Sequence, residues 1–417
     1  MKRSFSFGSA RDTALVVLGT GLIAGTYGLV RLAYGLFLPD IERSVPLGSA
    51  LAGYVSSGAS AAYCLGALVG VVAARHPRLL VAAAFATAAG GALGMAAAPG
   101  TGLLVPSVVL ASTGAGLASP AMVGVVARSL ARDDVDRGQA VVNSGTGPGL
   151  VGAGVLALAV PDWRAGFVVS AVLTAAAGVA VLLLDRGPGA APETDASGTS
   201  APRRTSPGGR TWMTALGWPL LGALLLGVAS APVWTYGRSH LVASGAGDTG
   251  SVLAWIALGA GGAATVLTAG TLSARPPTRA WALTTLVVAA SVAALTAPGR
   301  LPAAGLACAV FGWSFVAATS ALIAWVTEVD GDRAAAGTSA VFVALVMGQA
   351  AGSAAAGAVA DGAGLGVAFV GGGVAAVGAA AVGAARSHRE PGDRPDGGSG
   401  AAASPRPAPA GARPDRP

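Results

Sequence analysis

The sequence predicts an all-α membrane protein whose twelve transmembrane helices form two related six-helix halves. Three observations support this prediction. The apolar residues fall in long runs, most arginines lie on one side of the membrane if the spans alternate, and the same short motif occurs in both halves. An apolar run of roughly 20 residues is long enough to cross a hydrocarbon core of roughly 30 Å as a helix.

The composition agrees with a membrane location. Apolar residues make up 53% of the 417 residues and charged residues only 11%, whereas soluble domains carry roughly 25% charged residues. The 64 glycines lie largely inside the apolar runs, where small residues allow membrane helices to approach closely. The first run is longer than the apolar part of a signal peptide, so we interpret it as an uncleaved helix. The expected spans are residues 13–38, 50–74, 79–98, 102–127, 139–160, 163–184, 212–237, 251–273, 279–298, 302–327, 334–360 and 363–385.

The arginines predict the orientation. Of the 26 basic residues, 21 lie on one side if the spans alternate as expected, and positive residues favour the cytoplasmic side of a membrane. We therefore expect a multi-pass protein of the cell membrane with both termini in the cytoplasm. The remaining five basic residues are Arg31, Arg43, Arg164, Arg238 and Arg300.

Composition also divides the chain into domains. Residues 185–211 are rich in Pro, Gly, Ser and Thr and predict a flexible cytoplasmic linker. Residues 387–417 have too few apolar residues to fold and predict a disordered cytoplasmic tail. The N-terminal six-helix bundle is then expected over residues 1–184 and the C-terminal bundle over residues 212–386.

A repeated motif relates the two halves. Gly70 and Arg75 follow the second span, and Gly270 and Arg275 follow the eighth, each pair in the pattern Gly-x-x-x-Ala-Arg-x-Pro. Both copies are expected at the cytoplasmic side. Parallel repeats of six helices, related by a pseudo-twofold axis, are a known transporter architecture.

These residues resemble the signature of the major facilitator superfamily, Gly-x-x-x-Asp-Arg-x-Gly-Arg between helices two and three. Gly70, Arg75 and Arg78 match it, whereas Ala74 replaces the Asp and Pro77 replaces the second Gly. The resemblance covers residues 13–385 and implies a secondary active transporter that works by alternating access. It also implies that Gly70, Arg75 and Arg78 act in gating at the cytoplasmic side. Because the motif Asp is missing, this gate must be held by other contacts.

The second copy of the motif implies the same gating role for Gly270 and Arg275. In the fifth span, residues 143–152 are similar to the Gly-Pro motif of antiporters in this family, which slightly favours export. The end of the first span, residues 31–40, resembles a bacterial branch of the superfamily whose substrates are mostly undefined.

Arg31 is the central candidate for substrate binding. It lies within the first span, and Tyr27 and Tyr34 share its helix face at i−4 and i+3. An arginine inside the membrane usually faces a cavity or a partner, and a guanidinium between two phenols suits a carboxylate or an aromatic acid. The alternative is a structural arginine bonded to helix carbonyls. We expect a small organic substrate, and Arg31 favours an anionic one.

Other polar residues extend this candidate site. Asn143 and Gln349 are candidate substrate ligands, whereas the serines of these helices, including Ser56 and Ser353, are expected to bond neighbouring helices. Trp255 and Trp313 are expected to pack rather than to line a cavity.

Three residues near the outer side have two interpretations each. Trp234 and Arg238, at i and i+4, are either an interfacial anchor or an outer gate that faces the first span. Asp40 is the best candidate for proton coupling, because proton-coupled transporters use membrane carboxylates. Its alternative is an exposed loop acid.

Several other functions are disfavoured. The basic residues do not form one patch for nucleic acid, Lys2 is the only lysine and cannot supply a Walker A motif, and the three histidines have no metal-ligand spacing. Cys64 and Cys308 are expected to be small core residues without a disulfide. We expect no metal, no cofactor and a monomer in the lipid bilayer. A transporter-like receptor or scaffold, and less readily a membrane-embedded enzyme, remain as alternatives.

Overall fold

The computed structural model describes residues 7–186, 209–296 and 301–387. Regular structure within these ranges is entirely helical, and twelve of the described helical segments are long and apolar enough to cross a membrane. This result confirms the predicted fold class. The expected linker and tail fall mainly on residues 187–208 and 388–417, which lie outside the described residues.

Several spans are interrupted helices, so there are more helical elements than spans. The N-terminal half contains α1 (Ala10–Ile23), η1 (Ala24–Leu32), α2 (Ala33–Ser44), α3 (Ser49–Val72), α4 (Pro77–Ala96), α5 (Thr101–Ser129), α6 (Arg132–Asn143), α7 (Thr146–Ala159) and α8 (Trp163–Leu184). The C-terminal half contains α9 (Gly209–Ala243), α10 (Gly247–Ala264), η2 (Thr265–Leu267), α11 (Ala269–Ser273), α12 (Pro277–Thr296), α13 (Leu301–Val329), η3 (Gly331–Arg333), α14 (Ala334–Ala363) and α15 (Leu365–Ser387).

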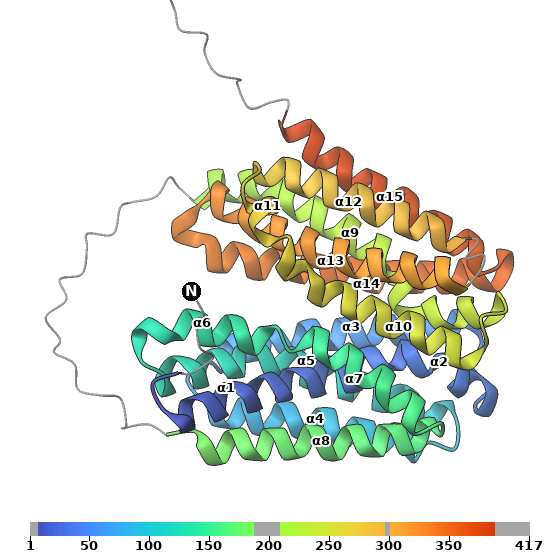
Figure 1. Cartoon of the computed structure of the whole chain (residues 1–417), viewed down its shortest axis with the longest axis horizontal. Coiled ribbons are helices and arrows are strands. Elements are labelled where there is room, and N and C mark those ends of the chain that lie inside the picture. The colour runs from blue at the N-terminus through green and yellow to red at the C-terminus, as the bar shows by residue number, and fades with distance from the viewer. Residues whose placement is uncertain (1–6, 187–208, 297–300, 388–417) are drawn as a thin grey trace, which may run out of the picture.

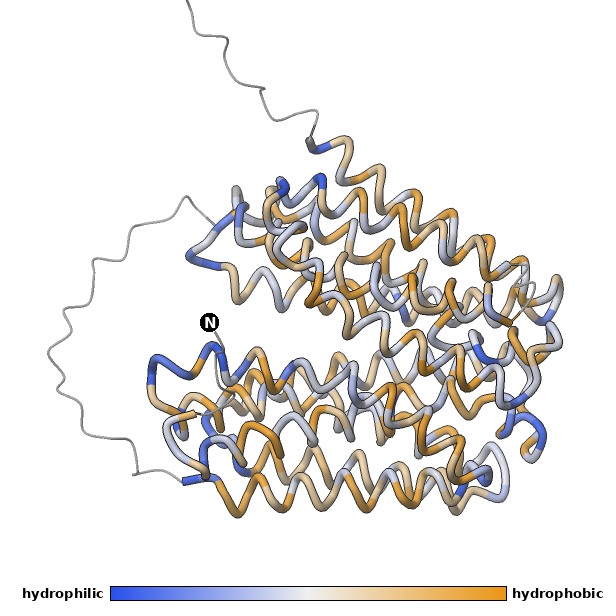
Figure 2. Tube along the Cα trace, viewed as in Figure 1, coloured by the Kyte–Doolittle hydropathy of each residue, from blue (hydrophilic) through white to orange (hydrophobic). Residues whose placement is uncertain are grey.

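The two halves form two bundles (Figure 1). They lie close together at one end and diverge at the other end, where α8 ends and α9 begins. We call these the far end and the linker end. The turns at residues 73–76 and 274–276, which lie within the two repeated motifs, are both at the linker end, as the internal repeat requires. Apolar residues run along most of the helices (Figure 2).

The three most extensive helix contacts between the bundles join α2 to α9, α3 to α14, and α7 to α10. These are spans one and seven, two and eleven, and five and eight. Each pair therefore takes one span from each half, in agreement with a twofold arrangement.

The first span is longer than its apolar run. It continues as α2 through Pro39 to Ser44, although the sequence suggested an end near residue 38. Proline removes one intrahelical hydrogen bond, but the polar residues that follow it find partners on α9 and α10. The extra turn of helix is thus stabilised by contacts with the other bundle.

Glycines allow the closest helix crossings. A Cβ on Gly35 of α2 would clash with the backbone of Trp234 on α9, and one on Gly53 of α3 would clash with the backbone of Ser353 on α14. These two crossings join the bundles. Cys64 and Cys308 are buried as free cysteines, as expected.

The crossing of α9 and α14 gives a test of this packing. A Cβ on Gly227 would clash with the carbonyl oxygen of Leu345, so Gly227→Ala should force these helices apart and lower the free energy of unfolding by about 1–3 kcal/mol. Thermal unfolding of the purified protein can be followed by the reaction of the buried Cys64 and Cys308 thiols with a fluorogenic maleimide.

Gly217 on the same helix is the matched control, because a Cβ there would meet no atom within 4 Å. Gly217→Ala should melt at the wild-type temperature or slightly above it, since alanine favours a helix over glycine. Equal melting temperatures for the two variants would contradict the close crossing.

Candidate functional site

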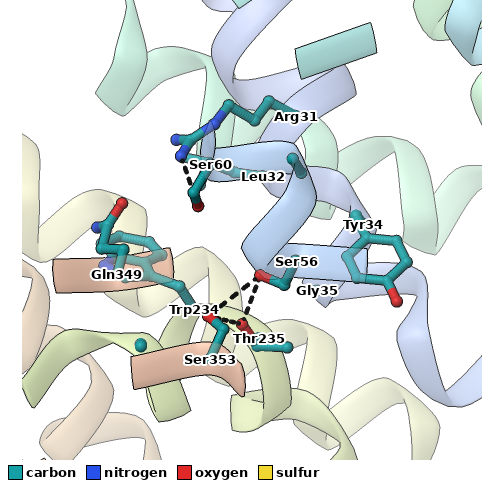
Figure 3. A pocket seen from close by; sticks show the side chains of 12 residues that line it. Arg31, Leu32, Tyr34, Gly35, Ser56, Ser60, Trp234, Thr235, Gln349 and Ser353 are labelled. Atoms are coloured by element: carbon teal, nitrogen blue, oxygen red, sulfur yellow. Dashed lines mark hydrogen bonds between the residues drawn. The ribbon is translucent and has the colours of Figure 1, made fainter. Parts of the chain in front are cut away.

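A small polar pocket lies between the two bundles (Figure 3). Its walls come from spans one and two of the N-terminal half and from spans seven and eleven of the C-terminal half. The lining residues are Arg31, Leu32, Tyr34, Gly35, Ser56, Ala59, Ser60, Ala231, Trp234, Thr235, Gln349 and Ser353. Arg31 is the only charged residue among them, so the pocket carries one positive charge.

Arg31 lies near the end of η1, a π-helical segment in the middle of the first span. Glycines let this segment approach its neighbours closely. A Cβ on Gly25 would collide with Thr174 of α8, and one on Gly28 would collide with the backbone of Gly149 on α7. π-Helical turns are rare and often occur at functional sites. Here the wider turn carries Arg31, which lines the pocket.

The Arg31 guanidinium contacts two residues of α3. It donates to the Ser60 hydroxyl at 3.5 Å and lies 4.7 Å from the centre of the Tyr63 ring. Its Nε is buried and has no hydrogen-bond partner among the described residues. No carboxylate lines the pocket to balance its charge.

The hydroxyl groups of Tyr27 and Tyr34, which were expected beside Arg31, bond to groups of α3. The Tyr27 hydroxyl is hydrogen-bonded to the Tyr63 hydroxyl, and Tyr27 does not line the pocket. Tyr34 does line it (Figure 3), but its hydroxyl donates to the Ala52 carbonyl at 3.3 Å. Both partners, Tyr63 and Ala52, lie on α3, so packing against this neighbouring helix decides where the two hydroxyl groups bond.

The two candidate amide ligands lie in different places. Gln349 of α14 lines the pocket on the wall formed by the C-terminal bundle (Figure 3). Asn143 is the last residue of α6, is exposed and does not line the pocket. The helix breaks after Asn143, so this residue is not carried toward the pocket by a continuous span.

Three hydroxyl groups close one side of the pocket. Ser56 of α3, Thr235 of α9 and Ser353 of α14 are mutually hydrogen-bonded, at 2.9 Å from Ser56 to Thr235, 3.3 Å from Ser56 to Ser353 and 3.1 Å from Thr235 to Ser353 (Figure 3). The expectation that Ser56 and Ser353 bond neighbouring helices is therefore met. This hydroxyl triangle joins both bundles, so it must break if they separate there.

Trp234 belongs to an aromatic cluster on the C-terminal bundle. Its ring centroid lies 6.3 Å from Trp255, 5.5 Å from Phe311 and 5.4 Å from Phe315. Trp234 lines the pocket, whereas Trp255 and Trp313 do not. The interpretation of Trp234 as an interfacial anchor is wrong, because the residue packs between the bundles rather than against lipid.

Arg238 connects the bundles at the far end. Its side chain is only 3% exposed and forms an ion pair with Asp40 of α2. It also donates to the Leu36 carbonyl at 2.7 Å and to the Ser251 hydroxyl at 3.1 Å, and lies 3.5 Å from the Asp248 carboxylate. A buried arginine with these partners is not a membrane anchor. It faces the first span, which is the position that the alternative interpretation expects.

Asp40 has two arginine partners, Arg238 and Arg43. Its side chain is 17% exposed, so the alternative interpretation as an exposed loop acid is wrong. Arg43 also pairs with Asp248 of α10 at 3.0 Å, but its side chain is 55% exposed. The Arg238 ion pair is therefore buried, whereas the Arg43 side chain pairs at the exposed surface.

The two motif copies at the linker end have different surroundings. A Cβ on Gly70 would lie 2.7 Å from the Pro120 ring of α5, whereas one on Gly270 would meet no atom within 4 Å. Arg75 and Arg275 are both exposed, and neither has a partner among the described residues. The close packing needed by the first motif is thus not needed by the second in this conformation.

Arg78, the third motif residue, pairs with an acid that the sequence did not suggest. Asp185, just beyond α8, has a fully buried carboxylate that accepts from Arg78 at 3.1 Å and from the Arg128 Nε at 2.8 Å. The motif Asp is Ala74 here, and Asp185 supplies a carboxylate at the same end of the bundle. Its position next to the last apolar residue of the sixth span was the available signal, but the partners are far apart in the sequence.

Solved transporters share this architecture. One is a bacterial homologue of the human lysosomal transporter Spinster in an inward-facing, unoccupied conformation, at 14% identity and a TM-score of 0.74 over 91% of this chain and 98% of that one. Another is a POT family transporter in complex with 5-aminolevulinic acid, at 13% identity and a TM-score of 0.73 over 91% and 96%. A third is a D-xylose-proton symporter, at 14% identity and a TM-score of 0.68 over 89% of this chain and 96% of that one.

At such low identity these similarities show the fold alone. None of the curated proteins compared with this sequence matches it. The family model of the Major Facilitator Superfamily matches residues 16–345, which is most of the chain. Together with the twelve spans, this match identifies a multi-pass membrane transporter rather than an enzyme, and the chain belongs to the Major Facilitator Superfamily.

Proposed function

We propose that this chain is a secondary active transporter of the cell membrane that moves a small organic anion by alternating access, with export slightly favoured. The observation that carries the proposal is the position of Arg31, the only charged residue in a pocket lined by both bundles. The substrate would bind there while the bundles rock about it.

The charge of Arg31 supports an anionic substrate. An arginine at the centre of a membrane helix costs about 2.5–3.5 kcal/mol on insertion scales, and only a hydroxyl and an aromatic ring offset that cost here. Neither supplies a negative charge. A carboxylate can accept two parallel hydrogen bonds from a guanidinium, which makes it a suitable ligand for this group.

Arginine distribution supports a cytoplasmic linker end, because 21 of the 26 basic residues belong to it under the expected alternation. The far end would then face the outside. Its buried Arg238–Asp40 pair and the hydroxyl triangle would form the closed outer gate of an inward-facing state. We assign Asp40 to this gate rather than to proton coupling, since both of its arginine partners hold it there.

The preference for export derives from residues 143–152, in which Gly145 and Gly149 pack on the first span. A Cβ on Gly145 would collide with the Thr20 carbonyl, and a Cβ on Gly149 would lie 2.6 Å from the Ala24 carbonyl. This segment therefore supports the helix that carries Arg31.

The first test concerns Arg31. The transported solute can be found by comparing the solutes that accumulate in cells with and without the protein, and its flux can then be measured in proteoliposomes. Arg31→Gln should reduce flux at least about tenfold, because hydrogen bonds to a charged group contribute about 1.5–3 kcal/mol. Insertion and thermal stability should be retained.

Arg164→Gln is the matched control. Arg164 also lies over an aromatic ring, that of Trp163, and donates to a backbone carbonyl, but it is outside the pocket. Its flux should stay near the wild-type value. Unchanged flux in Arg31→Gln would contradict the proposal, and no saturable flux in the wild type would favour a receptor or scaffold instead.

The second test concerns the outer gate. In a Cys64→Ala/Cys308→Ala background, Ala59→Cys places one thiol on the pocket wall. Adding Arg238→Gln should increase labelling of this thiol by an impermeant maleimide from outside several-fold, because removal of one partner from a buried ion pair strongly destabilises the closed form.

Arg43→Gln at the same end should change labelling much less, because exposed pairs contribute about 0–1 kcal/mol. Equal labelling in the Arg238→Gln variant and its parent would show that Arg238 does not hold the outer gate closed.

A further inference from the structure

The Trp234 side chain carries an unused hydrogen-bond donor at the pocket. Its indole Nε1 is buried and has no acceptor among the described residues. Trp234 lies with Gln349 on the wall of the C-terminal bundle, across the pocket from the helices that carry Arg31 and Ser60 (Figure 3). An indole N–H can only donate, so any ligand group that satisfies it must be an acceptor.

Buried indole N–H groups usually have partners, and other tryptophans of this bundle follow that rule. Trp313 donates to the Thr268 hydroxyl at 2.9 Å, and Trp281 donates to the Ala379 carbonyl at 2.8 Å. Trp255 also lacks an acceptor, but it lies behind Trp234 and does not line the pocket. Of the two tryptophans with an unused donor, Trp234 is therefore the one that lines the pocket.

The donor is also held in a fixed position. Trp255, Phe311 and Phe315 each meet the Trp234 ring edge-on, and Phe311 stacks on Phe315 with ring centroids 5.9 Å apart. A ring confined on several sides loses little further freedom when it binds a ligand. A donor fixed in this way discriminates between solutes that carry an acceptor at the matching place and solutes that do not.

Charge decides what kind of acceptor fits. Arg31 is the only charged lining residue, so one carboxylate balances the pocket and a second would lack a counter-ion. Near Trp234 the pocket offers neutral donors, namely the indole N–H and the Gln349 amide. A neutral oxygen acceptor can accept a hydrogen bond from these donors without adding a second negative charge.

We propose that the Trp234 indole N–H binds a neutral acceptor of the transported solute, such as a ketone, amide or ether oxygen, at the end remote from its carboxylate. The substrate class is then a monocarboxylate with a second, uncharged oxygen acceptor. This inference rests on the proposed function, because it takes the carboxylate to be bound by Arg31.

The test uses the purified full-length protein and pairs of monocarboxylates that differ only in the neutral acceptor. The first pair is 4-oxo-4-phenylbutanoate and 4-phenylbutanoate, and further aromatic and aliphatic pairs extend the set. Binding is measured by the shift in thermal unfolding and by calorimetry. The wild type should bind the acceptor-bearing members about 3- to 10-fold more tightly, the contribution of one neutral hydrogen bond.

Trp234→Phe keeps an aromatic ring and removes the donor, so it should abolish this preference while it retains carboxylate binding. Trp313→Phe is the matched control on the same bundle, since its N–H already has a partner, and it should keep the preference. An equal preference in Trp234→Phe and wild type would overturn the inference.

Arg31→Gln separates this inference from the proposed function. If carboxylates lose affinity in Arg31→Gln but Trp234→Phe still discriminates within each pair, only the inference fails. If carboxylates bind equally well to Arg31→Gln and wild type, the proposed function fails. If no monocarboxylate of the set binds the wild type, both are overturned.

Discussion

Close contact between helix backbones is the constraint on which the rest of the structure depends. Hydrocarbon gives helices no hydrophobic reason to associate, so membrane helices pack through small residues. Gly28 brings the first span onto α7, Gly35 brings it onto α9, and Gly53 brings α3 onto α14. These crossings surround Arg31 with residues of both bundles. A larger side chain at any of them would widen the gap that the pocket residues now bridge.

The ion pairs fall into two groups with different consequences. Asp185 joins Arg78 and Arg128 within the N-terminal bundle, so its pairs can persist while the bundles move. Asp40 joins Arg238 across the bundles, so its pair must break when the far end opens. In the proposed mechanism the first group stabilises one moving bundle, and the second contributes to the equilibrium between conformations. Both acids lie near helix ends, and only their partners distinguish them.

Much of the fold was predictable from the sequence, because span length and arginine placement follow directly from the hydrocarbon core. That Arg31 and Gln349 line a pocket could be predicted, since polar groups inside a membrane need partners. The bonds of Tyr27 and Tyr34 could not, because their partners lie on a neighbouring helix, α3. The role of Asp185 was also hidden, since no local pattern identifies which distant arginines will meet a carboxylate.

The two bundles contribute different chemical groups to the pocket, and transport would move these bundles relative to each other. The N-terminal bundle supplies its charge through Arg31, and the C-terminal bundle supplies the aromatic ring and neutral donors of Trp234 and Gln349. A ligand shifts a conformational equilibrium only as far as its affinity differs between the two states. A solute held by one bundle alone would move with it and bind both states alike. The affinity for a solute that contacts both halves changes when the halves separate. Its binding would therefore shift the equilibrium between the conformations of the proposed transport cycle.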